Sequence, residues 1–302
     1  MAITTGAHPK SFWPGVHKWF GISYGQHPEE WPDLYDTYPS DKNWEEDVQT
    51  TGFGLAPIKT EGQAVTFTTH HQGWYKRYIH VVYGLGYIVT RENIEDGLYA
   101  ELSTGRAESL AFSMRTSKEI VHANPINRMT SGSYLGGDGV ALLSTSHPTS
   151  TGGNQSNYLT PAADISESAI EDICIMAYTA KNNEGLQIPL RVMSLHIHPN
   201  DWFEANRILK STLQNDTANN AINALKATSA IPNGIKMNHY FTDTDAWGVK
   251  TDCPHGFRHF KRRAREFTKD NEFTSENAMA KATERYSCGW TDWRCWYGSP
   301  GA

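Results

Sequence analysis

Cysteine is scarce in this sequence, and its spacing excludes two common roles. The 302 residues contain four cysteines, and no two of them form a Cys-x-x-Cys pair. Such pairs, or a dense and even set of cysteines, would indicate a zinc site or a disulfide framework. The sequence therefore predicts reduced thiols. The positions are Cys174, Cys253, Cys288 and Cys295.

Long apolar runs and a basic excess are also lacking. No stretch approaches the roughly 18 consecutive apolar residues that a membrane-spanning helix needs. The N-terminus shows no basic region followed by an apolar run, as a secretion signal would. The formal net charge is −6, whereas a dedicated DNA-binding module usually has a net basic balance. We expect a soluble chain made in the cytoplasm, with no membrane partner.

Aromatic residues, in contrast, are plentiful. Apolar residues make up 38% of the chain and its mean hydropathy is −0.56, which is low for a compact protein of this length. Aromatics reach 12%. They bury large areas while keeping a polar group, and they are enriched where one protein meets another. The composition fits a chain that buries surface between subunits, or else an ordinary aromatic-rich domain.

Residues 1–51 have little helical or strand periodicity but many prolines and tryptophans. Proline fixes φ and removes a backbone donor, so such a stretch tends to run extended. We expect an N-terminal arm laid across another surface, with its Trp side chains buried mainly by other chains. A first layer packed on its own domain is the alternative. The tryptophans are Trp13, Trp19, Trp31 and Trp44.

Residues 52–88 predict a long β-hairpin. Val65 and Phe67 alternate with polar neighbours, a turn-like stretch follows at residues 70–73, and a β-rich return runs from Trp74 through Tyr83. An isolated two-stranded hairpin is barely stable in water. We therefore expect an extended loop that projects from its own subunit and packs on something else.

Residues 91–124 carry the longest helical signal. Thr90 is a plausible N-cap, Pro125 is expected to end the helix, and Gly97 and Gly105 are weak points that would divide it. The apolar stripe is narrow, which predicts that only one side of the helix is covered. It contains Leu98, Leu102, Leu110 and Met114.

The middle of the chain predicts a mixed α+β block. Residues 131–163 are rich in Gly, Ser, Thr and Pro and read as loops. We expect helices at 166–180, 200–213 and 217–227 and strands at 190–197, 235–241 and 247–251. The tail at 257–297 is mostly strand-like.

The histidines offer only weak evidence for a metal site. His196 and His198 lie on one side of a predicted strand, but zinc needs a third and usually a fourth ligand. His255 and His259 have the spacing of a helical metal pair, although Pro254 makes a helix there unfavourable. A cytosolic metal-dependent hydrolase that uses His196 and His198 remains an alternative, and ordinary buried histidines are favoured.

Other catalytic signals are equally unspecific. Ser144 and Ser146 lie beside His147, but catalytic partners meet in space and seldom in sequence. The stretch at residues 136–139 is glycine-rich but lacks the Lys-Ser/Thr of a phosphate-binding loop. We therefore expect no enzyme, and we assign no catalytic, cofactor-binding or metal-binding residue.

Charge is distributed in two opposite runs. Residues 29–47 hold eight acids against one base, and residues 258–265 hold five bases. Complementary patches steer and align an assembly. We predict that the acidic run of one subunit meets basic groups of another, and a solvated face is the alternative. The predicted partners are Arg262, Arg263 and Arg265.

Six stretches together resemble a known family by their order and spacing. They are residues 52–57 (GFGLAP), 87–96 (YIVTRENIED), 138–148 (DGVALLSTSHP), 209–213 (LKSTL), 242–247 (TDTDAW) and 284–294 (ERYSCGWTDWR). In this order they resemble the tailed-phage major capsid proteins with the Hong Kong 97-like fold, and more specifically the major head subunits of Mu-like phages. The resemblance covers nearly the whole chain, although no single motif is diagnostic.

The resemblance implies an α+β fold divided into four parts. They are an N-terminal arm (1–51), an extended loop (52–88), a peripheral domain with a long spine helix (89–135 and 253–302) and an axial domain (136–252). No catalytic residues transfer, because the family assembles and does not turn over a substrate. Lys59 and Lys76 lie on the expected loop, but no acceptor for a covalent cross-link can be located.

The implied function is that of a major capsid protein. Hexamers and pentamers of the chain would form an icosahedral shell around the phage genome, with a portal protein, possible cement or decoration proteins, and packaged DNA in non-specific proximity. Because the arm begins close to Met1, a separate scaffolding protein is implied. The expected location is the virion, after assembly in the host cytoplasm. An encapsulin-like compartment shell is the alternative with the same fold.

Overall fold

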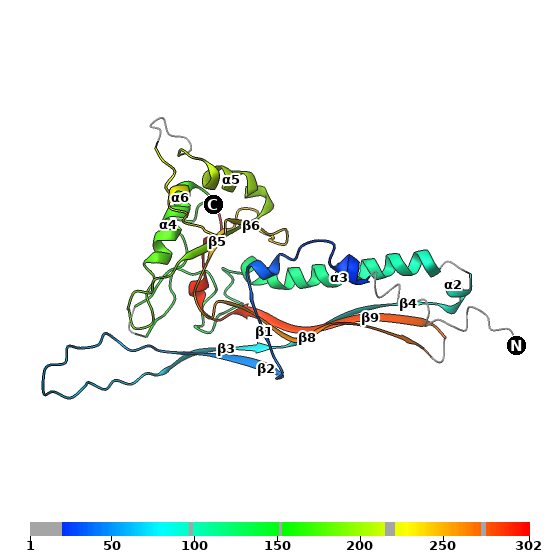
Figure 1. Cartoon of the computed structure of the whole chain (residues 1–302), viewed down its shortest axis with the longest axis horizontal. Helices are drawn as coiled ribbons and strands as arrows, with labels where there is room; N and C mark the ends of the chain where they lie inside the picture. Colours follow the sequence, from blue (N-terminus) through cyan, green and yellow to red (C-terminus); the bar gives the residue numbers. More distant parts are fainter. Residues whose placement is uncertain (1–19, 97–98, 151–152, 215–220, 273–275) are drawn as a thin grey trace.

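The computed structural model describes residues 20–302 except for 97–98, 151–152, 215–220 and 273–275. The molecule is elongated (Figure 1): a helix lies along a long sheet, a mixed α+β block stands at one end, and a hairpin projects beyond that end. The described residues form three sheets, with strand orders β1-β8-β9-β4, β10-β7-β5-β6 and β2-β3. No described helix has the length and apolar character needed to cross a membrane.

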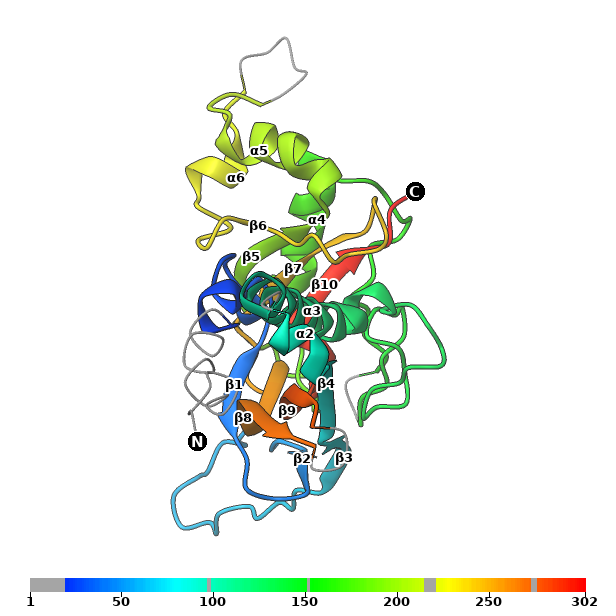
Figure 2. The same ribbon diagram turned by 90° about the vertical axis from the view of Figure 1, so that its right-hand side faces the viewer.

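The long sheet is built around the antiparallel pair β8 (Phe257–Asn271) and β9 (Ala278–Trp290). β4 (Val81–Val89) adds antiparallel to β9, and β1 (Asp36–Pro39) adds parallel to β8. Helix α3 (Tyr99–Asn127) covers one face of this sheet, and Figure 2 places it between the block above and the sheet below. Small side chains let helix and sheet approach closely. They are Ala107 and Ala111 of α3 and Ala278, Ala280 and Ala282 of β9.

The predicted long helix is present but ends later than expected. A short helix, α2 (Arg91–Glu95), precedes α3, and α3 continues past Pro125, so the prediction that this proline ends the helix is wrong. Proline lacks the N–H that would bond the carbonyl of Val121, four residues earlier. The Cys288 thiol donates to that carbonyl instead, with Sγ 3.7 Å from the oxygen. A donor from β9 thus replaces the missing bond.

The predicted apolar stripe of this helix is partly visible. Leu110 and Met114 are buried against the sheet. Gly105 lies within α3, which continues unbroken through it. Gly97, Leu98 and the side chain of Leu102 lie outside the described part of the chain.

The block is the predicted mixed α+β unit. Ser166 caps α4 (Glu167–Tyr178) by accepting the Ala169 N–H at 3.2 Å, as the sequence predicts. The other elements are β5 (Val192–Ile197), η4 (Pro199–Asp201), α5 (Trp202–Lys210), α6 (Ala224–Ala227), β6 (Ile235–Met237), β7 (Trp247–Thr251), η5 (Trp293–Cys295) and β10 (Trp296–Ser299). Strands β5 and β7 and helix α4 agree with the prediction.

Two helices of the block are shorter than predicted, and hydrogen bonds explain where they stop. Helix α5 ends at Lys210, whose carbonyl accepts from Lys226 Nζ at 2.7 Å. The predicted helix at 217–227 begins only at Ala224, because the Asn223 side chain caps it through the Lys226 N–H at 3.1 Å. Strand β6 also ends before residue 241. Residues 217–220 lie outside the described part.

The projecting hairpin is also built from different strands than expected. Its strands are β2 (Trp44–Thr50) and β3 (Gln72–Ile79), which pair antiparallel. No strand is assigned to described residues 51–71. The prediction of a strand around Val65 and Phe67 is therefore wrong for the single subunit. Residues 81–89, expected in the hairpin, are strand β4 of the long sheet.

Candidate assembly surfaces

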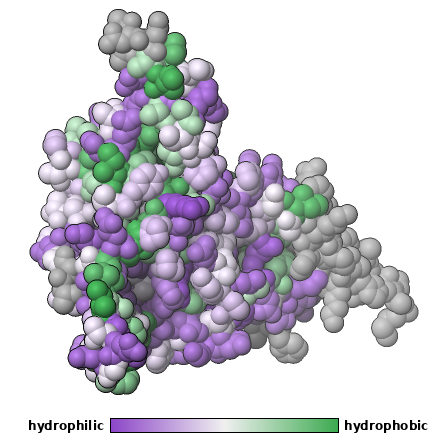
Figure 3. All heavy atoms as spheres, turned by 60° about the vertical axis from the view of Figure 1, so that its left-hand side comes forward, coloured by the Kyte–Doolittle hydropathy of each residue, from purple (hydrophilic) through white to green (hydrophobic). Residues whose placement is uncertain are grey.

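The loop at the end of the hairpin exposes a series of large apolar side chains. Its neck is closed by the Thr51 N–H, which donates to the His71 carbonyl at 2.9 Å. A β-turn at its tip has Gly62 at φ +81, a conformation that favours glycine. Ile58 and Phe67 are 96% and 93% exposed, and Figure 3 shows uncovered apolar side chains on this projection at the lower left. The other exposed apolar residues of the loop are Phe53, Leu55 and Val65.

One residue, His80, joins β3 of the hairpin to β4 of the long sheet. Its Nε2 lies 3.0 Å from Ser40 Oγ, and its Nδ1 lies 2.9 Å from Ser287 Oγ. Arg285 Nε donates to its carbonyl oxygen at 3.4 Å. Burial lowers the pKa of His80, and the neighbouring Arg285 guanidinium lowers it further. A neutral imidazole held on both sides therefore fixes how the hairpin leaves the sheet.

The segment that precedes the hairpin is bound by its own subunit. The Glu119 carboxylate of α3 accepts the backbone N–H groups of Glu30 and Trp31, both at 3.0 Å. Arg115, one turn earlier, donates to the carbonyl of Tyr24 at 3.0 Å and also to that of Pro28. Burial raises the pKa of Glu119 to about 7. Two side chains of one helix thus hold residues 24–31 against it.

This packing corrects the expectation about the tryptophans of the arm. Trp31 is buried in its own protomer, where its ring lies 4.7 Å from that of His122 and 4.5 Å from that of His259. Residues 31–35 fill a space between α3 and β8, so the expectation that other chains bury this Trp is wrong. Trp44, on the hairpin, is 41% exposed. Trp13 and Trp19 lie outside the described residues.

The histidines beneath Trp31 are neutral and buried. His122 Nε2 lies 2.9 Å from His259 Nδ1, and His122 Nδ1 lies 2.7 Å from the Lys118 carbonyl. Burial lowers the pKa of His122 to about 3 and that of His259 to about 2. Carbonyl, His122 and His259 therefore form a chain in which each ring donates one N–H. The pair therefore contributes to packing, and both ring nitrogens of His122 are occupied by hydrogen bonds within the subunit.

The acidic and basic runs do meet, but within one chain. Because β1 lies parallel to β8, with Asp36 opposite Arg258, the two runs are neighbours in the same sheet. Asp47 pairs with Arg258 at 2.9 Å, and Asp41 lies 3.8 Å from Arg262. The complementarity read from the sequence is real, whereas its assignment to different subunits is wrong for these pairs.

Other members of both runs also have partners in the protomer. Asp33 pairs with Lys236 at 3.0 Å. Arg265 lies over the ring of Tyr24 at 3.7 Å, and Arg263 donates to Thr283 Oγ1 at 3.0 Å. Arg263 and Arg265, which were also predicted to reach a second subunit, thus have partners within their own subunit.

The structure brings together two stretches that the sequence marked separately. His147 is buried, its Nδ1 lies 2.6 Å from Asp138 Oδ2, and its Nε2 lies 3.1 Å from Asn157 Oδ1. Asn157 Nδ2 donates to the carbonyls of Leu142 and Trp296, which fixes the orientation of its amide. Both ring nitrogens of His147 are thus hydrogen-bonded within the subunit. This arrangement sets the imidazole beside a carboxylate and positions no serine, so it ties loops together.

The remaining candidate histidines are not brought together. His196 is buried with its Nε2 2.9 Å from Ser194 Oγ, and His198 accepts the Asn200 N–H at its Nδ1. His255 lies 3.6 Å from Asp47, while His259 belongs to the buried pair. No group of three or more potential metal ligands occurs among the described residues.

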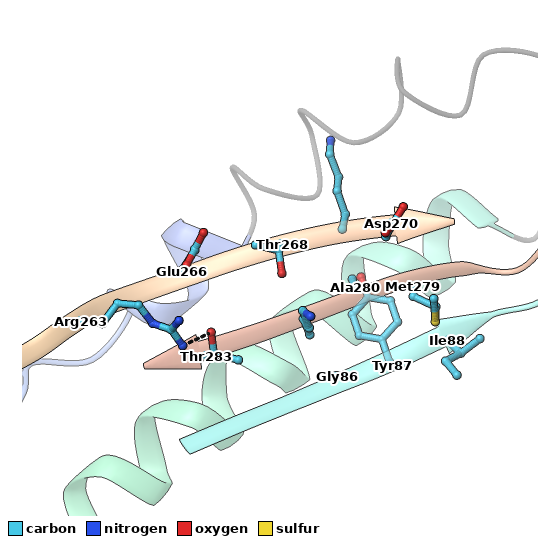
Figure 4. A pocket seen from close by; sticks show the side chains of 12 residues that line it. Gly86, Tyr87, Ile88, Arg263, Glu266, Thr268, Asp270, Met279, Ala280 and Thr283 are labelled. Carbon is cyan, nitrogen blue, oxygen red and sulfur yellow. Dashed lines mark hydrogen bonds between the residues drawn. The ribbon is translucent and has the colours of Figure 1, made fainter. Parts of the chain in front are cut away.

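The outer edge of β4 is a further exposed surface. β4 is the last strand of its sheet, and Val81, Val82, Leu85 and Ile88 are each about half exposed. A groove of about 670 Å³ runs from this edge across β9 to β8 (Figure 4). Gly86 and Ile88 line it from β4, Met279 and Thr283 from β9, and Arg263 and Asp270 from β8.

The sequence interpretation missed this edge. Its signal was present, since the nine residues of β4 include no charged side chain, whereas β8 carries acidic and basic residues along most of its length. An uncharged strand reads equally well as a buried central strand, and the sequence alone does not say that β4 ends the sheet.

Comparison with known proteins identifies the architecture. No family model and no curated protein matches the sequence. The capsid of an empty GTA particle matches with a TM-score of 0.57 at 11% identity, covering 90% of this chain and 90% of that one. The procapsid of bacteriophage JBD30 matches with a TM-score of 0.51 at 15% identity, covering 98% and 76%. A virus-like particle from Pyrococcus furiosus gives 0.51 at 8%, covering 95% and 99%. The predicted α+β capsid fold is confirmed.

Proposed function

We propose that this chain, which has the fold of phage capsid subunits, is the major capsid protein of a tailed phage. The observation that carries the proposal is the match with the GTA capsid over 90% of both chains, so that no large part of this chain is left for another task. The exposed apolar side chains of the loop and of β4 support it, because large exposed apolar patches mark interaction sites.

We assign the parts of the chain accordingly. Residues 1–51 are the arm, 52–88 the extended loop, 89–135 with 253–302 the peripheral domain, and 136–252 the axial domain; at the boundaries, β4 joins the sheet of the peripheral domain and β10 joins the sheet of the axial domain. The paired strands that carry the extended loop are β2 and β3. Helix α3 is the spine helix of the peripheral domain, and α4 and the sheet β10-β7-β5-β6 form the core of the axial domain.

The partners follow from this role. Hexamers and pentamers of the chain form an icosahedral shell in the virion, assembled in the host cytoplasm with a separate scaffolding protein and a portal protein. Decoration proteins and packaged DNA are further neighbours. The chain is structural and not enzymatic, which agrees with the partners found for His147, His196 and His259 in the protomer.

Electron microscopy of the purified, concentrated chain tests the proposal. Closed shells, open sheets or rings of capsomers are the expected result, because a missing scaffold affects closure more than subunit contacts. A chain that stays a compact monomer at every concentration, by sedimentation and by microscopy, contradicts it.

A compartment shell without a genome is the second candidate, favoured by the match to nearly the full length of the virus-like particle subunit. The contents of particles made during phage infection distinguish the two functions. Particles that protect double-stranded DNA from nuclease support the phage capsid, whereas particles that enclose only protein support the compartment.

A further inference from the structure

One segment of the loop has the composition of a strand but no strand partner. Residues 64–70 (AVTFTTH) contain β-branched and aromatic residues, no proline and no Asp, Glu, Lys or Arg. Among the described residues, none hydrogen-bonds to their backbone. A short, uncharged segment of this kind readily pairs with another strand when it is left exposed.

The two edges of the long sheet differ in how they are protected. At one edge, β1 covers residues 258–261 of β8, and the rest of β8 carries side chains such as Arg263 and Lys269. Charges and a covering strand are the usual means by which proteins block edge-to-edge pairing. At the other edge, β4 has no covering strand and no charged residue. Only the β4 edge is thus left open to an added strand in the described sheet.

The loop and the β4 edge of one chain lie toward opposite ends of the molecule. β3 and β4 follow each other through His80, so the chain runs from the loop at one end of the molecule toward the far end of the long sheet (Figure 1). The loop therefore extends away from the β4 edge of its own subunit. A partner for either feature has to come from a second copy.

We propose that residues 64–70 of one copy add as a strand to the β4 edge of a second copy. The lengths agree, with seven residues against nine in β4. Val65 and Phe67 lie on one face of such a strand, because side chains alternate. On that face, the two side chains extend the groove of the second copy past Gly86, where β4 has no side chain. The strand pairing supplies affinity through main-chain hydrogen bonds. The inference rests on the proposed function and names the contact that the loop makes.

Amide hydrogen exchange on the whole chain, before and after assembly, tests this pairing. In the unassembled subunit, amides 64–70 exchange at nearly unprotected rates. In assembled particles, alternate amides of 64–70 and the outward amides of β4 slow by about tenfold or more.

The outcomes separate this inference from the function on which it rests. Particles in which 64–70 still exchange fast overturn the strand addition and leave the capsid proposal standing. Protection of β4 without protection of 64–70 assigns the edge to another segment and also overturns it. A chain that stays monomeric overturns the proposed function and the inference together.

A pair of proline variants supplies a matched control. Thr68 and Thr69 are neighbours, and neither backbone N–H is bonded within the subunit, so Thr68→Pro and Thr69→Pro leave subunit folding intact. In an added strand, one of the two N–H groups faces the ladder and the other faces away. We expect one variant to lower the yield of particles about tenfold and the other to assemble nearly normally. Equal behaviour of the two variants overturns the strand addition.

Discussion

In the sheet of the block, β5 and β7 have nearly every side chain buried, whereas six of the nine residues of β4 in the long sheet are exposed. The block closes its core with α4 and α5, and Leu195, Ile197 and Val249 have no exposed surface. The long sheet has a helix on one face and apolar residues at one edge and along the projecting loop. The block thus buries the inner faces of its strands within one chain, whereas the elongated part leaves apolar side chains of β4 and of the loop uncovered.

Two truncations of aromatic side chains should separate these regions most clearly. Trp247 is buried in the block, and its Nε1 donates to the Ala163 carbonyl at 3.0 Å. We expect Trp247→Ala to lower the free energy of unfolding of the unassembled subunit by about 3–5 kcal/mol. Phe67→Ala should leave it within about 0.5 kcal/mol, because the ring is 93% exposed, and should reduce assembly instead. Denaturant unfolding and sedimentation measure both effects. A large loss of subunit stability in Phe67→Ala would refute the comparison.

The polar part of the block can be tested at Asp138. Asp138→Asn keeps the shape of the side chain but replaces the carboxylate that hydrogen-bonds the buried ring of His147. We expect a loss of about 2 kcal/mol in the free energy of unfolding. Asp41→Asn is the matched control, because Asp41 is exposed and its contact with Arg262 is 3.8 Å long. It should change stability by less than about 0.5 kcal/mol, and an equal loss in both variants would contradict the role given to His147.

The long sheet should reveal its buried histidines through pH. In the unfolded chain these imidazoles bind protons below about pH 6.5, whereas burial holds the folded pKa values of His122 and His259 near 3 and 2. Their contribution to stability is therefore complete above pH 6.5 and is lost as the pH falls toward 3. Each contributes a slope of up to about 1.4 kcal/mol per pH unit.

A variant isolates this effect from other titrating groups. Glu119, whose raised pKa lies near 7, acts in the opposite direction, since its contribution is lost as the pH rises from about 4.5 to 7. Urea unfolding at several pH values should show a shallower acid loss in His259→Gln than in the unmodified chain. Identical slopes between pH 6.5 and 4.5 would show that His259 binds its proton equally well in the folded protein.

The smallest expected effect lies where α3 meets β9. Cys288→Ala removes the donor to the Val121 carbonyl and should cost about 0.5–1 kcal/mol. In a Pro125→Ala background, the new backbone N–H replaces that donor, so the same substitution should cost close to nothing. A double-mutant cycle measures the difference. Additive costs would mean that the thiol acts only by packing.

The sequence was informative wherever local chemistry decides the structure. Ser166 as a cap, the strand at Trp247–Thr251 and the order of the parts could all be predicted, because caps, alternation and family-like spacing are local or ordered signals. The prediction that Pro125 ends the helix was wrong because the donor that replaces its missing N–H comes from Cys288, which is distant in sequence. The prediction that other chains bury Trp31 was wrong because its burial depends on where residues 31–35 lie against α3, which the sequence does not specify.

The same reasoning explains the outcome at the loop and at the charged runs. Val65 and Phe67 have the pattern of a strand, but a pattern reports propensity and not the presence of a partner. The acidic and basic runs were matched correctly by charge. Their placement in one chain depends on the parallel pairing of β1 with β8, which no composition reveals.

The projecting loop has the mechanics of a lever that pivots where β2 and β3 end, because bonds from Asp47 to Arg258 and from Tyr78 to Thr291 hold the paired strands to the rest of the subunit. From Gln72 to the turn at Gly62 the chain extends for up to roughly 30 Å, at about 3.3 Å per residue. A rotation of about 10° at this pivot displaces the tip by about 5 Å, while β4 and the rest of the sheet stay in place. The hydrogen bonds between Thr51 and His71 at the neck of the loop set the resting angle. In a closed shell, where neighbouring copies meet at more than one inclination, one sequence can thereby satisfy several curvatures with the same contact at its tip.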